Sequence, residues 1–322
     1  MSAVEELRRL GGAELSGFLD AVEGRLQRTV AAAPGAVARA GAETLHAGGK
    51  RLRPTLVYLS APIGGRATHG VEVAAAAVEL VHMATLVHDD VLDEAPLRRG
   101  HPTAWATHGE PVAVATGDYL FARAFAELAT LADPVSIRVL SQTAVELARG
   151  ELLQAGQARN PEVSAEAVLE RCRLKTGRLF AAACSLGGRL GGLPLEGAAA
   201  LDRFGEYLGL AFQLADDVLD CAGDPTRTGK ALGTDLRDGT TSLPLLLAAQ
   251  TDPTLAAALR VPVAAADVLP LLARVERTGA LAQVRDTADS YARRAEAELE
   301  LAPGSDAIAL RAILLRVIDR DS

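Results

Sequence analysis

An all-helical fold is predicted for this 322-residue chain from its composition and from the spacing of its apolar residues. Hydrophobic residues make up 49% of the chain but aromatic residues only 3%, so Ala, Leu and Val must fill most of the core. Such a core favours closely packed helices over sheets. Apolar residues also recur at helical spacing between glycine- and proline-containing breaks. The length is sufficient for a large core, and we predict a single domain over residues 1–322.

The first part of the chain is expected to form four helices. Residues 3–30 carry apolar positions at helical spacing, with a break at Gly11-Gly12. The second helix covers residues 35–46 and ends at Gly48-Gly49. A long apolar run over roughly residues 71–93 predicts a buried central helix, and a fourth helix covers about residues 111–132.

Further helices are predicted over residues 134–155, 164–186 and 195–221, the second of them beginning at Ser164. Helical patterning returns from Leu243 to Ser322, with breaks at Asp252-Pro253 and at residues 302–306. Gly117, Gly150 and Gly156 are expected where helix backbones approach closely. The polar, glycine-rich segment 221–244 is typical of a mobile lid.

Charge and cysteine content argue against several classes of protein. A net charge of −8, with no long basic tract, argues against a nucleic-acid partner. The N-terminal residues lack the pattern of a signal peptide, and no uncharged apolar run reaches 18 residues, so we expect a cytoplasmic protein without a membrane span. Cys172, Cys184 and Cys221 form no close pair and are expected to be buried, reduced thiols.

The end of the central helix carries the first candidate site. Asp89, Asp90 and Asp93 follow an apolar run in the sequence HDDVLD, and their spacing places them on one side of a helix. Three such carboxylates would repel one another and resist burial unless a cation lies between them, and oxygen ligands favour Mg²⁺. A solvated acidic helix end is the alternative.

A second copy of the pattern favours the metal site. Asp216, Asp217 and Asp220 in FQLADDVLD have the same spacing, 127 residues downstream. Two such clusters facing each other across a cavity would hold several divalent ions around one diphosphate. Gln213 precedes Asp216 by three residues and therefore lies beside it on a helix.

Basic residues accompany both acidic clusters. Only three of the 33 basic residues are lysine, namely Lys50, Lys175 and Lys230, and each lies beside a candidate phosphate-binding sequence. Lys50 lies in GGKRLRP with Arg51 and Arg53, which is either an anion-binding loop or a solvated basic turn. Lys175 could reach toward phosphate or extend to solvent.

Two arginines and a histidine accompany the first cluster. Arg98 and Arg99 follow it just beyond Pro96, so a metal site and a polyanion site are expected together. His82 lies two turns before Asp89 on the same stripe, as either a core residue or a ligand-binding one.

Taken in order, these sequences resemble the trans-isoprenyl diphosphate synthases of the polyprenyl synthetase family over nearly the whole chain. The matching motifs are GGKRLRP, HDDVLD with RRG, GDYLFA, GELLQ, KTG, FQLADDVLD, and GK with GTDL and LPLL. The resemblance implies an isoprenoid synthase fold, with antiparallel helices around a deep central cavity. It also implies a homodimeric transferase that condenses isopentenyl diphosphate with an allylic diphosphate. In that reaction the allylic substrate loses its diphosphate group and leaves a carbocation.

The resemblance also implies roles for the site residues. The aspartates would bind three Mg²⁺ ions on the allylic diphosphate: Asp89, Asp90, Asp93, Asp216, Asp217 and Asp220. That diphosphate would also be bound by Arg98, Lys175 and Lys230. The diphosphate of isopentenyl diphosphate would be bound by Lys50, Arg53, His82 and Arg99, while Thr176 and Gln213 would line the reacting carbons. One departure is Thr240, which stands where the family often has lysine.

Product length is expected to depend on Ala84 and Thr85. In members of this family that make short products, a bulky aromatic side chain at the position of Ala84 ends chain growth. Neither residue is bulky, and the helix continues with Val81, Ala77 and Val73. We therefore expect a product of about twenty carbons or more, and the pattern favours about thirty to forty. The alternatives are a geranylgeranyl (twenty-carbon) diphosphate synthase, a class I terpene cyclase and a non-catalytic partner subunit. Both intact aspartate clusters and GGKRLRP argue against the last two.

Overall fold

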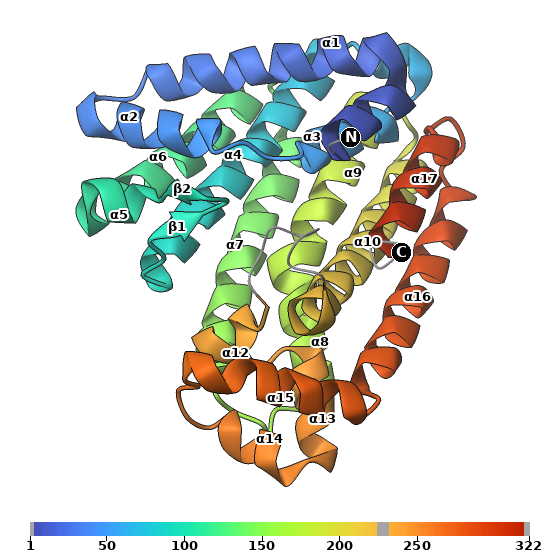
Figure 1. Ribbon diagram of the computed structural model, residues 1–322. Coiled ribbons are helices and arrows are strands. Elements are labelled where there is room, and N and C mark those ends of the chain that lie inside the picture. The colour runs from blue at the N-terminus through green and yellow to red at the C-terminus, as the bar shows by residue number, and fades with distance from the viewer. Residues whose placement is uncertain (1–2, 224–231, 319–322) are drawn as a thin grey trace. The chain divides into compact units, whose positions relative to one another are not determined.

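The structure is a computed structural model that describes residues 3–223 and 232–318, with side chains described for residues 12–223 and 232–317. Almost all of its regular structure is helical (Figure 1), which confirms the predicted fold class. The chain divides into two compact units. Unit 1 comprises Met1–Ala144, Ala182–Asp202 and Leu299–Leu310, and unit 2 comprises Val145–Ala181, Arg203–Glu298 and Arg311–Ser322.

Unit 1 is built around the long helix α4. In chain order it contains α1 (Ala3–Ala31), α2 (Gly35–His46), α3 (Leu52–Ser60), a 3₁₀ turn (Ile63–Gly65), α4 (His69–Leu92), α5 (Ala104–His108) and α6 (Glu110–Ala129). The contact between α4 and α6 is the most extensive among its elements, and α1 and α3 also pack on α4 (Figure 1). The break predicted in the first helix occurs at Gly12, whose φ of 66° lies in the left-handed region.

Helix α4 is the core of unit 1 because its composition allows burial on every side. Val73, Ala74, Ala77, Val81 and Ala84 are all fully buried. Small and β-branched side chains at these positions let neighbouring helices approach closely. α4 is also the only described helix long and apolar enough to cross a membrane, but 72% of its apolar window is buried, as expected for a core helix of a folded protein.

A short hairpin follows α4 and was not predicted. Strands β1 (Leu97–Arg98) and β2 (His101–Pro102) pair antiparallel, with Arg98 opposite His101. The turn between them places Arg99 at φ 54° and Gly100 at φ 80°. Two consecutive left-handed residues are typical of tight hairpin turns, in which glycine is favoured.

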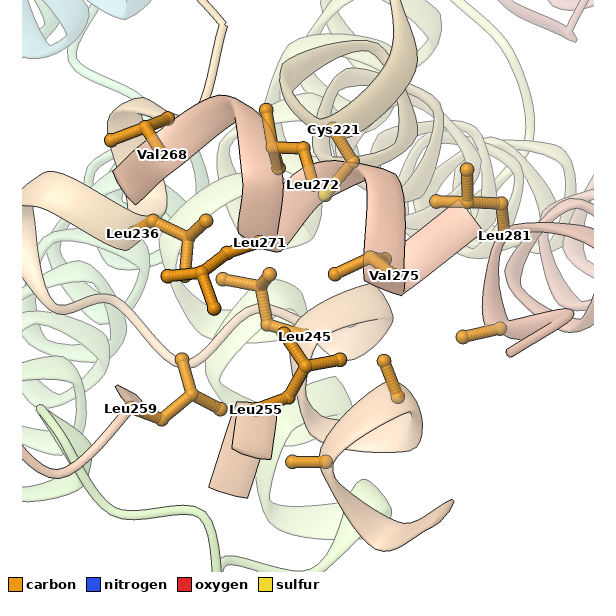
Figure 2. Packing of buried hydrophobic residues seen from close by; sticks show 13 residues of the cluster. Cys221, Leu236, Leu245, Leu255, Leu259, Val268, Leu271, Leu272, Val275 and Leu281 are labelled. Atoms are coloured by element: carbon orange, nitrogen blue, oxygen red, sulfur yellow. The ribbon is translucent and has the colours of Figure 1, made fainter. Parts of the chain in front are cut away.

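Unit 2 contains α8 (Ala165–Cys172), a π-helical turn (Arg173–Gly177), α12 (Thr234–Asp238), α13 (Leu243–Thr251), α14 (Pro253–Ala258), α15 (Ala265–Arg277) and most of α16 (Ala280–Leu299). Its smaller helices enclose an apolar cluster (Figure 2), in which Cys221, Leu236, Leu245, Leu272 and Val275 are buried. All three cysteines are free and buried, which confirms the prediction for them.

Besides α16, four described helices have residues in both units: α7 (Pro134–Gln157), α9 (Arg178–Leu190), α10 (Leu195–Ala222) and α17 (Ala307–Ile318). The single helix predicted over residues 164–186 is wrong in one respect, because a π turn separates α8 from α9. Such turns are rare and frequently occur at functional sites. No periodicity argument distinguishes one π turn from the surrounding α-helix.

The three glycines expected at close backbone approaches differ from one another. A Cβ on Gly150 would lie 2.9 Å from the backbone nitrogen of Lys175, so this expectation is confirmed. A Cβ on Gly117 would instead meet the ring of His88, 2.2 Å from Nε2. Nothing lies within 4 Å of the equivalent position at Gly156, so the expectation is wrong there.

Candidate functional site

The first aspartate cluster, Asp89, Asp90 and Asp93, lies at the C-terminal end of α4. Asp89 and Asp90 belong to its last turn, and Asp93 is the residue that follows the helix. Asp90 is only 4% exposed, whereas Asp93 is exposed. Burial raises the pKa of Asp90, Asp93 adds to the effect, and the neighbouring Arg98 opposes it. The cluster therefore combines one buried carboxylate with more accessible ones.

The hairpin after α4 brings Arg98 back to the first aspartate cluster. Arg98 Nε donates to Asp90 Oδ1 at 2.6 Å. Arg99, in the turn of the hairpin, donates to the backbone carbonyl of Gly48 in the GGKRLRP loop. The two adjacent arginines therefore contact different parts of unit 1.

The GGKRLRP loop separates its three cations. Arg51 has a left-handed backbone at φ 46°. Its guanidinium contacts Glu23 at 2.9 and 3.3 Å and Glu79 at 3.2 Å. Arg51 is therefore neutralised by two glutamates, while Lys50 is exposed. Glu79, only 3% exposed, was missed by the sequence analysis, although a glutamate inside the apolar run of α4 indicated a buried ion pair.

Arg53 and His82 lie in a strongly positive environment. The pKa of Arg53 is lowered to about 10, mainly by burial. The positive charge of Arg99 also lowers this pKa, whereas Glu79 raises it. Burial and four surrounding arginines lower the pKa of His82 well below its ordinary value, so the imidazole is neutral at neutral pH. The structure thus brings Arg53, His82 and Arg99 into one region, in which an anion would relieve the repulsion between like charges.

His88, adjacent to the first aspartate cluster, is held by α6. Its ring stacks on Phe121 with centroids 5.9 Å apart, and Nε2 lies 3.3 Å from the carbonyl oxygen of Val114. Gly117 leaves space for the ring. This packing explains the sequence GDYLFA, in which Gly117 and Phe121 both contact His88.

The second aspartate cluster, Asp216, Asp217 and Asp220, lies on α10. Asp217 is 6% exposed, and burial raises its pKa to about 7. Asp216 and Asp220 raise it, and Gln213 and the buried Arg171 lower it. Gln213 Nε2 donates to Asp217 Oδ1 at 2.8 Å, and Thr176 Oγ1 donates to Gln213 Oε1 at 2.7 Å. The two residues expected to line the reacting carbons are therefore connected to this cluster.

Asp220 of the same cluster binds backbone N–H groups through its carboxylate. Its carboxylate oxygens accept the backbone N–H groups of Thr234 at 2.9 Å and Asp235 at 3.1 Å, at the start of α12. Asp220 therefore fixes the chain that follows the second aspartate cluster. Asp235, which the sequence analysis did not assign, has a pKa raised well above its ordinary value by burial and by Asp217 and Asp220. Its signal was its place in GTDL.

Part of the predicted lid lies outside the described residues, including Lys230. Residues 232–242, which are described, contain α12 instead of an open loop. Gly239 ends that helix at φ 83°, and Thr240 donates its backbone N–H to the carbonyl of Asp235 at 2.9 Å. The segment is joined to the second aspartate cluster by the hydrogen bonds from Thr234 and Asp235 to Asp220.

Lys175 lies in the π turn and faces α7. Its Nζ forms an ion pair with Glu151 and donates to Gln154 Oε1 at 3.1 Å. Gly150 makes this close packing possible, as described above. Although the Lys175 side chain is partly exposed, these two contacts hold its ammonium group against α7 instead of leaving it extended into solvent. The GELLQ sequence supplies both partners, which the sequence analysis had left without a role.

The residues predicted to control product length lie on the buried part of α4. Ala84 is fully buried, and Thr85 donates its hydroxyl to the carbonyl of His82 at 2.8 Å. Ala76, Ala77 and Val81 are also fully buried. A larger side chain at Ala84 would thus have to displace its neighbours or fill space within the protein.

The donor set is compatible with Mg²⁺ only when other ligands take part. Within residues 3–223 and 232–318, no group of three or more His, Cys, Asp or Glu side chains is arranged to hold a metal ion by itself. Mg²⁺ commonly binds through one or two carboxylates together with water and substrate phosphates. The aspartate oxygens suit that mode, in which phosphate completes the coordination.

Comparisons with known proteins agree with one another. The sequence profile of the polyprenyl synthetase family matches residues 35–267. The chain is 38% identical over 310 residues to heptaprenyl diphosphate synthase component 2 of Geobacillus stearothermophilus, covering 95% of this chain and 97% of the relative. It is 40% identical over 265 residues to nonaprenyl diphosphate synthase of Mycobacterium tuberculosis, covering 80% and 78% of the two chains.

A solved structure extends the similarity to the fold. The polyprenyl synthase from Caulobacter crescentus CB15, complexed with calcium and isoprenyl diphosphate, has a TM-score of 0.88 at 35% identity. The match covers 99% of this chain and 98% of that one.

Proposed function

Because the chain belongs to the polyprenyl synthetase family and is therefore a prenyltransferase, we propose that it condenses isopentenyl diphosphate with an allylic diphosphate to make an all-trans polyprenyl diphosphate. The observation that carries this proposal is that each aspartate cluster has its own polar partners. Arg98 contacts Asp90 in unit 1, and Thr176 and Gln213 connect to Asp217 in unit 2. We propose that both clusters act on the same allylic diphosphate, within one catalytic domain over residues 1–322.

The six aspartates are proposed to bind three Mg²⁺ ions. The oxygen donors suit this metal, and the similar polyprenyl synthase was solved with calcium and isoprenyl diphosphate. When bound, Mg²⁺ supplies positive charge that stabilises a diphosphate leaving group. Asp90 and Asp217 must be ionised for this role, and binding of the metal would favour their ionised forms over the raised pKa values.

The chain's own cations are proposed to bind the two diphosphates separately. Arg98, Lys175 and Lys230 would hold the allylic diphosphate and neutralise charge as its C–O bond breaks. Lys50, Arg53, His82 and Arg99 would hold isopentenyl diphosphate. His82 would act there as a neutral hydrogen-bond donor, because its pKa is low. Lys175 must then exchange its contact with Glu151 for phosphate, or share the ammonium between them.

A product of about thirty carbons or more is proposed, rather than the twenty-carbon geranylgeranyl product. The buried stripe of α4 contains Ala and Val instead of an aromatic side chain at the relevant position. The relatives named above are a heptaprenyl and a nonaprenyl diphosphate synthase, which supports the longer range. The growing chain would extend along α4 toward its N-terminus, in the central cavity implied by the resemblance.

A cytoplasmic homodimer is proposed as the working form. The name of the Geobacillus relative, component 2, supports the different possibility that a second kind of subunit is needed. Light scattering of the purified chain, combined with an activity measurement on the same sample, distinguishes these two cases. An inactive dimer that gains activity only with a partner would exclude the homodimeric enzyme.

The reaction itself is tested with the purified chain, Mg²⁺, an allylic diphosphate and labelled isopentenyl diphosphate. The proposal predicts label in an extended chain and loss of turnover with EDTA. A terpene cyclase would consume the allylic diphosphate without incorporating label. A non-catalytic subunit would do neither. Either result would exclude the proposed activity of this chain.

A further inference from the structure

One face of α10 contacts the π turn through several residues. Glu206, Gly209, Gln213 and Asp217 are separated by three or four residues and therefore share one stripe of the helix. Gln213 contacts Thr176 of the π turn and Asp217 of the second aspartate cluster. The stripe thus runs from Glu206 at one end to a predicted metal ligand at the other.

Glu206 contacts both ends of the π turn. Its Oε2 accepts from Arg173 Nη1 at 3.2 Å and from Arg178 Nη1 at 2.8 Å. Arg173 is the first residue of the turn, and Arg178 is the first residue after it. Since one carboxylate oxygen bridges the two arginines, Glu206 fixes the separation between the beginning and the end of the turn.

Close backbone packing leaves the turn little freedom relative to α10. A Cβ on Gly209 would lie 2.7 Å from the Cα of Gly177, at the end of the turn. A Cβ on Gly205 would lie 2.5 Å from the carbonyl oxygen of Phe180. These glycines let α10 lie directly against the turn, so a change in the turn would be transmitted to Thr176 and Gln213.

Each arginine also has a partner that does not touch α10. Arg173 contacts Glu170 on α8 at 2.7 and 2.9 Å, and Arg178 contacts Glu146 on α7 at 2.7 Å. Removing the charge of Glu206 therefore leaves neither arginine without an acidic neighbour. Because no uncompensated charge results, the protein should fold, and the effect on the turn can be measured separately from the effect on stability.

We propose that Glu206 is a positioning residue that holds the π turn, and with it Lys175 and Thr176, in the conformation that binds the allylic diphosphate. This inference rests on the proposed function of the same site. Glu206 does not contact the substrate. It acts through Arg173 and Arg178 on the turn, and through the turn on Thr176, Gln213 and Asp217.

The test compares Glu206→Gln with a matched control, Glu170→Gln. Both variants remove one acidic partner of Arg173, but Glu170 lies three residues before it, on α8, and its side chain is 42% exposed. Glu206→Gln should raise the KM for the allylic diphosphate, or lower kcat, by about tenfold, as is usual for residues that support a ligand-binding group. The KM for isopentenyl diphosphate should change by less than about twofold, as should every parameter of Glu170→Gln.

A binding measurement gives a readout that does not depend on turnover. Calorimetric titration with inorganic diphosphate and Mg²⁺ should show about tenfold weaker binding to Glu206→Gln than to Glu170→Gln. In a double-mutant cycle, Glu206→Gln should weaken diphosphate binding less in the Arg178→Gln background than in the wild type, because both substitutions open the same bridge.

Three outcomes separate the possibilities. Equal kinetic and binding constants for Glu206→Gln and Glu170→Gln would overturn the inference. An equal rise in the KM values of both substrates would also overturn it, because a general loss of structure would produce that result. A wild-type chain that does not incorporate isopentenyl diphosphate would instead exclude the proposed function, whatever the variants do.

Discussion

Arg98 Nε donates to Asp90 Oδ1 over 2.6 Å, so the most buried carboxylate of the first aspartate cluster has a cation beside it. Arg98 reaches this position because the hairpin of β1 and β2 reverses the chain directly after α4. The contact joins a predicted metal ligand to a predicted diphosphate ligand. A metal ion bound by Asp90 and a diphosphate bound by Arg98 would therefore lie next to each other at the end of α4.

Substitution of an aspartate from either cluster should abolish turnover while the protein remains folded. Asp89→Ala and Asp216→Ala each remove a proposed metal ligand and also relieve repulsion between carboxylates. Loss of one leaving-group contact typically costs about 10²–10³ in rate, and loss of metal binding should cost more. Steady-state kinetics with a thermal unfolding curve for each variant provides the measurement. Asp286→Ala, at an exposed position on α16, is the control. Near-wild-type activity of either site variant would contradict the metal assignment.

The cations should separate into two kinetic groups. Lys50→Ala and Arg53→Ala should mainly raise the KM for isopentenyl diphosphate, because the C–O bond to that diphosphate does not break and the group remains attached to the product. Lys175→Ala and Lys230→Ala should change the KM for the allylic substrate and lower kcat, because the allylic diphosphate is the leaving group. KM and kcat measured with each substrate varied in turn provide the comparison. The same defect in all four variants would remove the division of roles.

The raised pKa of Asp217 predicts a stability difference that depends on pH. Its pKa is about 7 in the folded protein and about 3.8 in the unfolded chain, so the folded state binds the proton more tightly and loses stability as pH rises between those values. Asp217→Asn cannot ionise. In metal-free buffer the variant should therefore become increasingly more stable than wild type from pH 4 to 7, and the difference should level off above pH 7.

Melting temperatures of the two proteins across that pH range test this prediction, because the effects of groups that do not interact with Asp217 cancel in the difference. Mg²⁺ with inorganic diphosphate should stabilise wild type more than Asp217→Asn and so reduce the difference. A difference that does not change with pH would show that Asp217 titrates as an ordinary exposed carboxylate.

An aromatic side chain at Ala84 should shorten the product. The position is fully buried and about one and a half turns before Asp89, or roughly 7.5 Å along the helix. Ala84→Phe should place a ring across the path of the growing chain and reduce the product to about fifteen to twenty carbons. Mass analysis of products gives the readout, and Ala84→Val is the control for a smaller increase in volume. An unchanged product distribution in Ala84→Phe would show that the chain does not grow past this position.

Helix periodicity and motif spacing predicted most of the fold and most of the candidate site. The aspartates of both clusters, Arg98, Lys175 and Gln213 could be identified because each belongs to a motif that repeats or has a defined helical spacing. Helical spacing placed Gln213 beside Asp216, whereas its observed hydrogen bond, at 2.8 Å, is to Asp217 of the same cluster.

The remaining features depend on contacts between residues far apart in the sequence. Glu23 and Glu79 neutralise Arg51, and Glu206 bridges two arginines, but the local sequence does not show which residues are paired. The π turn differs from an α-helix by a single wider turn, which apolar spacing does not reveal. Asp220 shares the spacing of Asp93, but its hydrogen bonds to Thr234 and Asp235 at the start of α12 join residues 14 and 15 positions apart and have no signal in that spacing.

Product mass tests the central claim most directly. Purified wild-type protein is incubated with Mg²⁺, excess isopentenyl diphosphate and, in separate reactions, allylic primers of ten, fifteen and twenty carbons. The account predicts Mg²⁺-dependent incorporation of several isopentenyl units and a common final product of about thirty carbons or more from each accepted primer. A final product of about fifteen carbons, or consumption of primer without incorporation of isopentenyl diphosphate, would contradict it.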